Sequence, residues 1–164
     1  MQLSPAVVTW DELRAGVVVA EDAGFDTIWV FDHFMGQMIS GGSMLEPFTL
    51  LGALAVSTCR IGVGSLVLNV VNRSAAVIAS GTASVQAMSR GRFILGLGAG
   101  ASPTSRWAGE HRVLGVQLGA TIAERHARLC SQRSMSWTGC GRRLASPSSR
   151  RSPNRSLCHR SFWG

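Results

Sequence analysis

The chain has 164 residues, of which 46% are apolar, and a net charge of +7 in which every basic residue is an arginine. This length supports one hydrophobic core and excludes two ordinary domains. The charge does not indicate a uniformly basic, nucleic-acid-binding domain, because residues 1–129 contain nine arginines and nine acidic residues and are therefore neutral.

The first predicted helix begins at Trp10. Thr9 and Glu12 have the spacing of a capping box, in which each side chain accepts a hydrogen bond from the other residue's backbone N–H. Apolar residues then recur at helical spacing as far as Gly24, a residue type that is typical of a helix C-terminus.

The elements that follow alternate between strands and helices. Residues 26–31, DTIWVF, form a short apolar run rich in β-branched and aromatic residues, which predicts a buried strand. Residues 60–68 and 92–97 are two more runs of this kind. Helices are predicted between the runs, one starting at Pro47, which suits the first helical position, and one capped by Ser74.

The last segment, residues 130–164, differs from the rest in composition. It contains seven arginines, nine serines and no acidic residue, and it lacks apolar periodicity. We therefore expect a domain boundary near Cys130, followed by a basic tail that is disordered or encoded in a shifted reading frame. The alternative function is nucleic-acid binding, with the arginines on phosphates and aromatic rings on bases, although the tail has no recognisable binding module. The rings are those of Trp137, Phe162 and Trp163.

Alternating helices and strands predict a parallel sheet, which occurs in open doubly wound sheets and in (βα)8 barrels. Gly96, Gly98 and Ala101 match the permissive dinucleotide fingerprint G-x-G-x-x-G/A. A dinucleotide site needs a helix directly after these residues and an acidic residue about 20 positions further on. Pro103 follows within a few residues, and residues 114–123 contain no acid, so the barrel is favoured.

Four segments, in this order and at these intervals, resemble the bacterial luciferase-like flavin-dependent oxidoreductases, a family that includes F420-dependent members. They are AEDAGFDTIWVFDHF, LEPFTLLGALAVSTCRIGVGSLV, NRSAAVIASGTASVQAMSRGRFILGLGAG and ERHARL. The likeness covers residues 1–129 and implies an α/β fold, a partial (βα)8 TIM barrel of about the first four βα units. An intact barrel takes about 250 residues, so we expect a truncated form that is weakly active or inactive.

The resemblance implies a flavin or deazaflavin site at the carboxyl ends of the strands. Asp32 and His33 match the aspartate-histidine pair that closes the family's second strand. His33 is the candidate for proton handling or ring contact, with Asp32 orienting groups around it; the alternative is that His33 only caps the strand end. Successive strand residues point to opposite faces, so we expect only one of the two side chains to enter the pocket.

Ser65, Leu66 and Val67 match the third-strand bulge of the family, where a cis peptide often lies against the flavin ring. By position the cis bond joins Leu66 and Val67, and the alternative is an ordinary trans strand. These three residues are the first set of expected cofactor contacts.

Gly98, Ala99 and Gly100 match the end of the fourth strand, where missing side chains let the backbone approach the cofactor. A tight turn at positive φ is a compatible role for the glycines. Ala101 stands where some F420-dependent dehydrogenases have a glutamate, so the resemblance does not support sugar-phosphate dehydrogenase activity.

The resemblance implies a monooxygenase-type oxidoreductase that acts on a small organic substrate with reduced FMN or coenzyme F420, and the residues do not decide between the two. No metal site is expected. Unpaired edges of a half barrel predict self-association. The first residues lack a basic leader, and the longest nearly apolar run is shorter than the roughly 20 residues that span a bilayer, so we expect a cytoplasmic protein without membrane contact.

Overall fold

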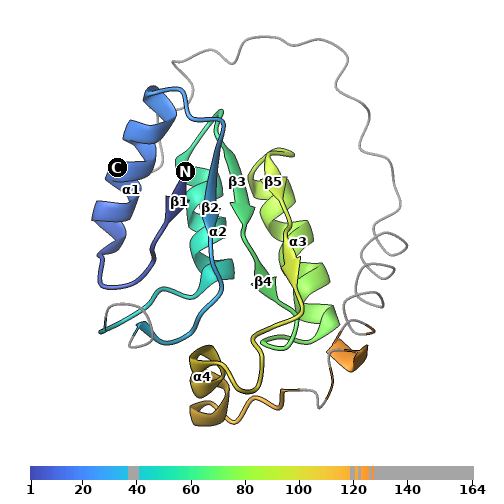
Figure 1. Ribbon diagram of the computed structural model, residues 1–164. Helices are drawn as coiled ribbons and strands as arrows, with labels where there is room; N and C mark the ends of the chain where they lie inside the picture. Colours follow the sequence, from blue (N-terminus) through green and yellow to red (C-terminus); the bar gives the residue numbers. More distant parts are fainter. Residues whose placement is uncertain (37–40, 119–120, 122, 126, 128–164) are drawn as a thin grey trace.

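The computed structural model describes residues 1–36, 41–118, 121, 123–125 and 127. They form a four-stranded parallel sheet with helices over one face and a shorter helix beyond the strand tips (Figure 1). The strands of this sheet are β1 (Gln2–Leu3), β2 (Thr27–Val30), β3 (Gly62–Ser65) and β5 (Phe93–Ile94). The helices are α1 (Trp10–Asp22), α2 (Pro47–Ser57), α3 (Ala75–Met88) and the short α4 (Gly109–Val113).

The strands lie side by side in the order β1, β2, β3, β5, which is also their order in the chain. Every neighbouring pair is parallel. A doubly wound sheet reverses its strand order at a switch point, whereas a (βα)8 barrel keeps the order of the chain. The described strands therefore follow the barrel order that the sequence predicts.

Local sequence signals set the helix ends as predicted. Oγ1 of Thr9 accepts from the N–H of Glu12 at 3.3 Å, and Oε2 of Glu12 accepts from the N–H of Thr9 at 2.8 Å, which completes the capping box of α1. Pro47 is the first residue of α2, and Ser74 caps α3. Gly24, after the end of α1, has a φ of +84°, a conformation that glycine adopts without strain.

The hydrophobic core lies between the sheet and its covering helices. Alternate strand residues point into it, so that Ile28, Val63 and Phe93 lie side by side on neighbouring strands. On the opposite face, the Trp29 ring lies across Gly64, where a Cβ would be 2.5 Å from Cζ3 of the indole. The helix residues that fill the core are Leu13, Val17, Ala20, Leu50, Leu51, Leu54, Ala55 and Val85.

A second, shorter pair of parallel strands continues β3 and β5 toward their carboxyl ends. It consists of β4 (Leu68–Asn69) and β6 (Leu97–Gly98). The single strands predicted for residues 60–68 and 92–97 are therefore each divided in two.

The cause of this division is a side chain that takes the place of a backbone partner. The hydroxyl of Ser65 donates to O of Gly96 at 2.9 Å, and its oxygen accepts from the N–H of Gly96 at 3.0 Å. The peptide bond between the next two residues, Leu66 and Val67, is cis, at the position that the resemblance implied.

Residues 128–164 lie outside the described residues. The predicted boundary near Cys130, the disordered or frame-shifted tail and the nucleic-acid-binding alternative fall there and stay predictions. Within the part of the chain that the structure describes, no helix is long and apolar enough to cross a membrane.

Candidate functional site

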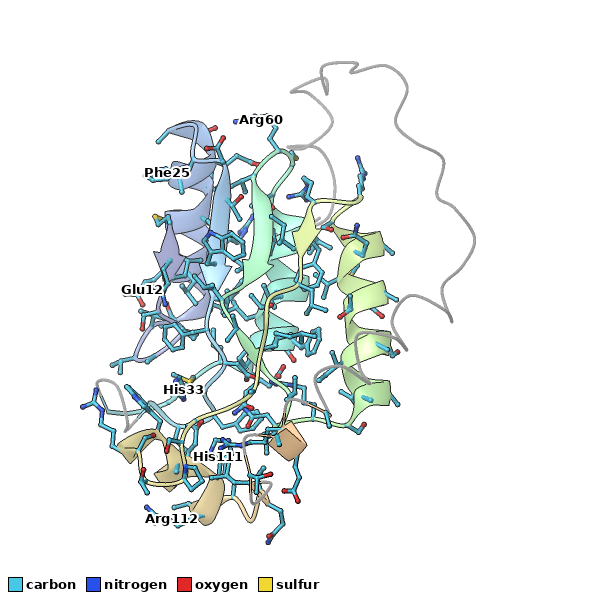
Figure 2. All side chains as sticks on the ribbon, turned by 45° about the vertical axis from the view of Figure 1, so that its right-hand side comes forward. Glu12, Phe25, His33, Arg60, His111 and Arg112 are labelled. Atoms are coloured by element: carbon cyan, nitrogen blue, oxygen red, sulfur yellow. The ribbon has the colours of Figure 1, made fainter. Side chains whose placement is uncertain are left out.

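Asp32 and His33 lie just after β2, separated from its last residue by Phe31, and their side chains differ in exposure. The Asp32 side chain is buried toward the helices. The His33 side chain is 24% exposed and lies at the end of the molecule that also carries α4, as Figure 2 shows by the positions of His33 and His111. Of the two side chains, only that of His33 is partly exposed.

The Asp32 carboxylate is fully occupied by neighbours. Its Oδ2 accepts from Nη1 of Arg73 at 2.6 Å and from the N–H of Asn69 at 2.8 Å, while Oδ1 accepts from Nη2 of Arg73 at 3.1 Å. Arg73 also pairs with Glu46, the N-cap of α2. Burial lowers the pKa of Arg73, but these two carboxylates outweigh it and raise the pKa above its ordinary value. Asp32 thus ties β2 to β4 and, through Arg73, to α2.

His33 is held by residues that come much later in the chain. Its Nδ1 lies 2.9 Å from Oε1 of Glu110, the second residue of α4. The other carboxylate oxygen, Oε2, accepts from the N–H of Phe34 at 3.1 Å. The imidazole also lies against the Trp107 ring, with centroids 4.8 Å apart and ring planes tilted by 33°, and meets Phe31 edge-on with centroids 5.8 Å apart.

The Glu110 carboxylate is ionised in spite of its burial. Burial raises its pKa, but the hydrogen bond and charge of His33 and the Phe34 N–H outweigh this, so that the pKa of Glu110 lies below its ordinary value. The sequence reasoning missed Glu110 and Trp107 because the segment around them has no amphipathic pattern. The available signal was a pair of adjacent titratable residues, Glu110 and His111, shortly after the glycine-rich strand end.

The three expected cofactor contacts at the end of β3 have different surroundings. Leu66 and Val67 are 51% and 39% exposed, although they adjoin buried strand residues. Leu66 is held beside β2, because its N–H donates to O of Val30 at 2.8 Å. Ser65 is fully buried, and its hydroxyl is used by Gly96, so its contact is with the neighbouring strand.

The expected contacts at the end of the fourth strand lie close to these residues. A Cβ on Gly98 would be 2.4 Å from Cγ2 of Val67, so the missing side chain makes room for that valine. Gly100 has a φ of +90°, and a Cβ there would be 2.8 Å from Oδ1 of Asn69. Ala99, between the two glycines, is half-buried. The structure thus brings Val67 and Gly98 together and gives Gly100 the turn conformation.

A second cluster lies beside the first, around His111. Its Nε2 is 3.1 Å from Nδ2 of Asn69 and 2.9 Å from Oδ1 of Asn72, and the side chain is buried. Among the described residues, no group of three His, Cys, Asp or Glu side chains is arranged to hold a metal ion.

Comparisons with known proteins show which family the chain belongs to. A family model described as luciferase-like monooxygenase matches residues 1–156, which extends past the end of the likeness expected from the sequence. The chain is 37% identical over 86 residues to the 5,10-methylenetetrahydromethanopterin reductase of Methanolobus tindarius, a match that covers 52% of this chain and 24% of that enzyme. It is 39% identical over 84 residues to the F420-dependent glucose-6-phosphate dehydrogenase of Amycolatopsis mediterranei, covering 51% of this chain and 25% of that enzyme.

Solved structures share the fold. An F420-dependent secondary alcohol dehydrogenase aligns with a TM-score of 0.66 at 20% identity, over 82% of this chain and 38% of that one. The oxygenating constituent of 3,6-diketocamphane monooxygenase from Pseudomonas putida, in complex with FMN, aligns with a TM-score of 0.62 at 18% identity, over 80% and 36% of the two chains. These likenesses confirm the predicted partial barrel, and the chain spans about a quarter of the length of the curated relatives it matches. The chain therefore belongs to the luciferase-like monooxygenase family, a family of flavin- and F420-dependent oxidoreductases.

Proposed function

We propose that this chain forms the ring-binding edge of a flavin- or F420-dependent oxidoreductase that acts on a small organic substrate. One observation carries the proposal: the exposed Leu66–Val67 step, with its cis peptide, lies at the same strand-end edge as the partly exposed His33. An exposed apolar step beside an imidazole suits a planar heteroaromatic ring, which needs apolar contact over its face and a polar group at its rim.

His33 contributes the polar group. Its Nε2 makes no hydrogen bond to any residue that the structure describes, whereas Nδ1 is held by Glu110. An imidazole nitrogen that carries a lone pair can accept a proton at the rim of a bound ring or substrate.

The choice of cofactor follows the curated relatives. The name of the 39% identical relative states dependence on F420, whereas the FMN complex is a fold-level likeness at 18% identity. We therefore propose F420 as the first candidate, supplying hydride to the substrate, and FMN, supporting monooxygenation, as the second.

The described strands hold the ring better than the phosphate. Phosphate sites in (βα)8 enzymes usually lie after the seventh and eighth strands, and the family resemblance matches the described strands to the first four. We therefore propose that the described residues contact the ring of the cofactor and not its phosphate.

Fluorescence quenching of F420 and of FMN by the purified chain tests this function. We expect saturable quenching, stronger for F420, with a Kd raised about tenfold in Leu66→Ala, which corresponds to about 1.4 kcal/mol. Val56→Ala, at a comparably exposed residue on the outer side of α2, is the matched control and should bind as the unchanged chain does. Absence of quenching at millimolar cofactor, or an equal loss in both variants, would contradict the proposal.

A further inference from the structure

Two consecutive residues of α4 bind two different strand ends. Glu110 contacts His33 and Phe34 after β2, and His111 contacts Asn69 in β4 and Asn72 after it. Both α4 side chains are 1% exposed. The short helix therefore links the segment after β2 to β4, which follows the cis Leu66–Val67 step, and its own five residues are too few to be stable without these contacts.

The protonation of the His33 ring follows from its partner. An ionised carboxylate only accepts hydrogen bonds. Since Oε1 of Glu110 lies 2.9 Å from Nδ1 of His33, Nδ1 must carry a hydrogen and donate it. In the neutral imidazole the lone pair is then on Nε2, the nitrogen without a described partner.

The ring orientation is fixed as well. The Trp107 ring lies against the imidazole, Phe31 meets it edge-on, and Glu110 holds one edge. Asp32, the adjacent carboxylate in the sequence, cannot take this part, because both its oxygens are used by Arg73 and Asn69.

We propose that Glu110 is the positioning residue for His33: it fixes the imidazole in the Nδ1–H tautomer and leaves the Nε2 lone pair available at the strand-end edge that also carries Leu66 and Val67. This inference rests on the proposed function for what Nε2 acts on. The tautomer itself is a property of the chain without cofactor, so it is measured independently.

Glu110→Gln gives a sharp test because the Phe34 N–H is a fixed backbone donor. The oxygen of the new amide must accept from Phe34, which leaves its NH2 group facing Nδ1 of His33. An NH2 group only donates, so Nδ1 must become the lone-pair nitrogen and the proton must move to Nε2. The variant is therefore expected to invert the tautomer while keeping nearly the same side-chain volume.

The measurement is the pair of imidazole 15N shifts of His33 in two-bond 1H–15N spectra at pH 8, assigned among the four histidines by the signals lost in His33→Asn. We expect the Nδ1–H tautomer in the unchanged chain and the Nε2–H tautomer in Glu110→Gln. Two matched controls, Glu46→Gln and Asp32→Asn, remove carboxylates at the same edge of the sheet and should leave the His33 tautomer unchanged.

Three results would overturn the inference: an Nε2–H tautomer in the unchanged chain, no change in Glu110→Gln, or a change in Asp32→Asn alone. If Glu110→Gln fails to fold, as judged by circular dichroism, the tautomer of the unchanged chain still decides. Failure of the proposed function is distinguishable, because it leaves the tautomers as expected and abolishes cofactor quenching in the unchanged chain.

Discussion

The contact between Val67 and Gly98 tests the reasoning about this edge of the sheet most directly. A Cβ on Gly98 would lie 2.4 Å from Cγ2 of Val67 but 3.5 Å from its Cβ. Gly98→Ala therefore forces the branched side chain against a new methyl group, whereas an alanine at position 67 would accept that methyl group at ordinary contact distance. The two substitutions should be strongly coupled.

The magnitudes follow from these distances. Gly98→Ala alone overpacks the site and should lower the free energy of unfolding by about 1–3 kcal/mol. Val67→Ala removes two methyl groups from a side chain that is 39% exposed and should cost about 1 kcal/mol. The double variant should be no less stable than Val67→Ala, which makes the coupling energy about 1–3 kcal/mol in favour of the pair.

Urea unfolding, followed by tryptophan fluorescence, measures all four free energies. Gly96→Ala is the matched control, because its Cβ would lie 2.3 Å from the backbone O of Ser65, which no side-chain change at position 67 can relieve. Additivity of Gly98→Ala and Val67→Ala within about 0.5 kcal/mol would refute the reasoning, and would return Gly98 to the interpretation in which its missing side chain serves cofactor approach.

Three further predictions concern the ion pair between Arg73 and Asp32, the hydrogen-bonded carboxylate of Glu21 and the unpaired edges of the sheet. Arg73→Met leaves the buried Asp32 carboxylate without its counter-ion and should lower the free energy of unfolding in urea by about 3–5 kcal/mol. Arg60→Met, whose partner Asp22 is exposed, is the control and should lower it by less than about 1 kcal/mol. Equal losses would contradict a structural role for the ion pair between Arg73 and Asp32. Burial raises the pKa of Glu21, but hydrogen bonds from the N–H groups of Cys59, Arg60 and Ile61 outweigh it and hold the pKa below its ordinary value of 4.5. The ionised carboxylate therefore stabilises the fold above pH 4.5, and this stabilisation is lost as the pH falls through the lowered pKa. Between pH 7 and pH 3 the melting temperature should fall less in Glu21→Gln than in the unchanged chain, and parallel curves would contradict this. We propose that chains associate through the outer edges of β1 and β5, which pair with no described residue. Light scattering should show oligomers whose population falls in Ile94→Lys, on β5, and does not fall in the control Val77→Lys, on α3. A monomer in the unchanged chain would contradict this proposal.

Much of the fold follows from signals between residues that lie only a few positions apart in the sequence. The capping box at Thr9 and Glu12, the proline that opens α2 and the serine that caps α3 act within one helical turn, so their outcome needs no knowledge of distant residues. The buried strands were also recognisable, because apolar β-branched runs have few other stable places in a small domain.

The division of the two later strands was not predictable in the same way. Each run looks continuous in the sequence, and only the approach of Ser65 to Gly96, 31 residues apart, shows that a side chain replaces the backbone pairing there. The cis bond at Leu66–Val67 was predicted by family resemblance and not by composition or periodicity.

The candidate site shows the same difference between what local sequence signals predict and what depends on contacts between distant residues. By itself the sequence determined that an aspartate and a histidine follow the apolar run that forms β2, because that run and the polar residues after it can be recognised within a few positions. Only the tertiary structure decided their partners: Arg73 and Asn69 occupy Asp32, whereas Glu110, 77 residues after His33, holds the imidazole. The physical reason is that a hydrogen bond depends on the positions of two atoms in space, and only the tertiary fold places α4 beside the residues that follow β2.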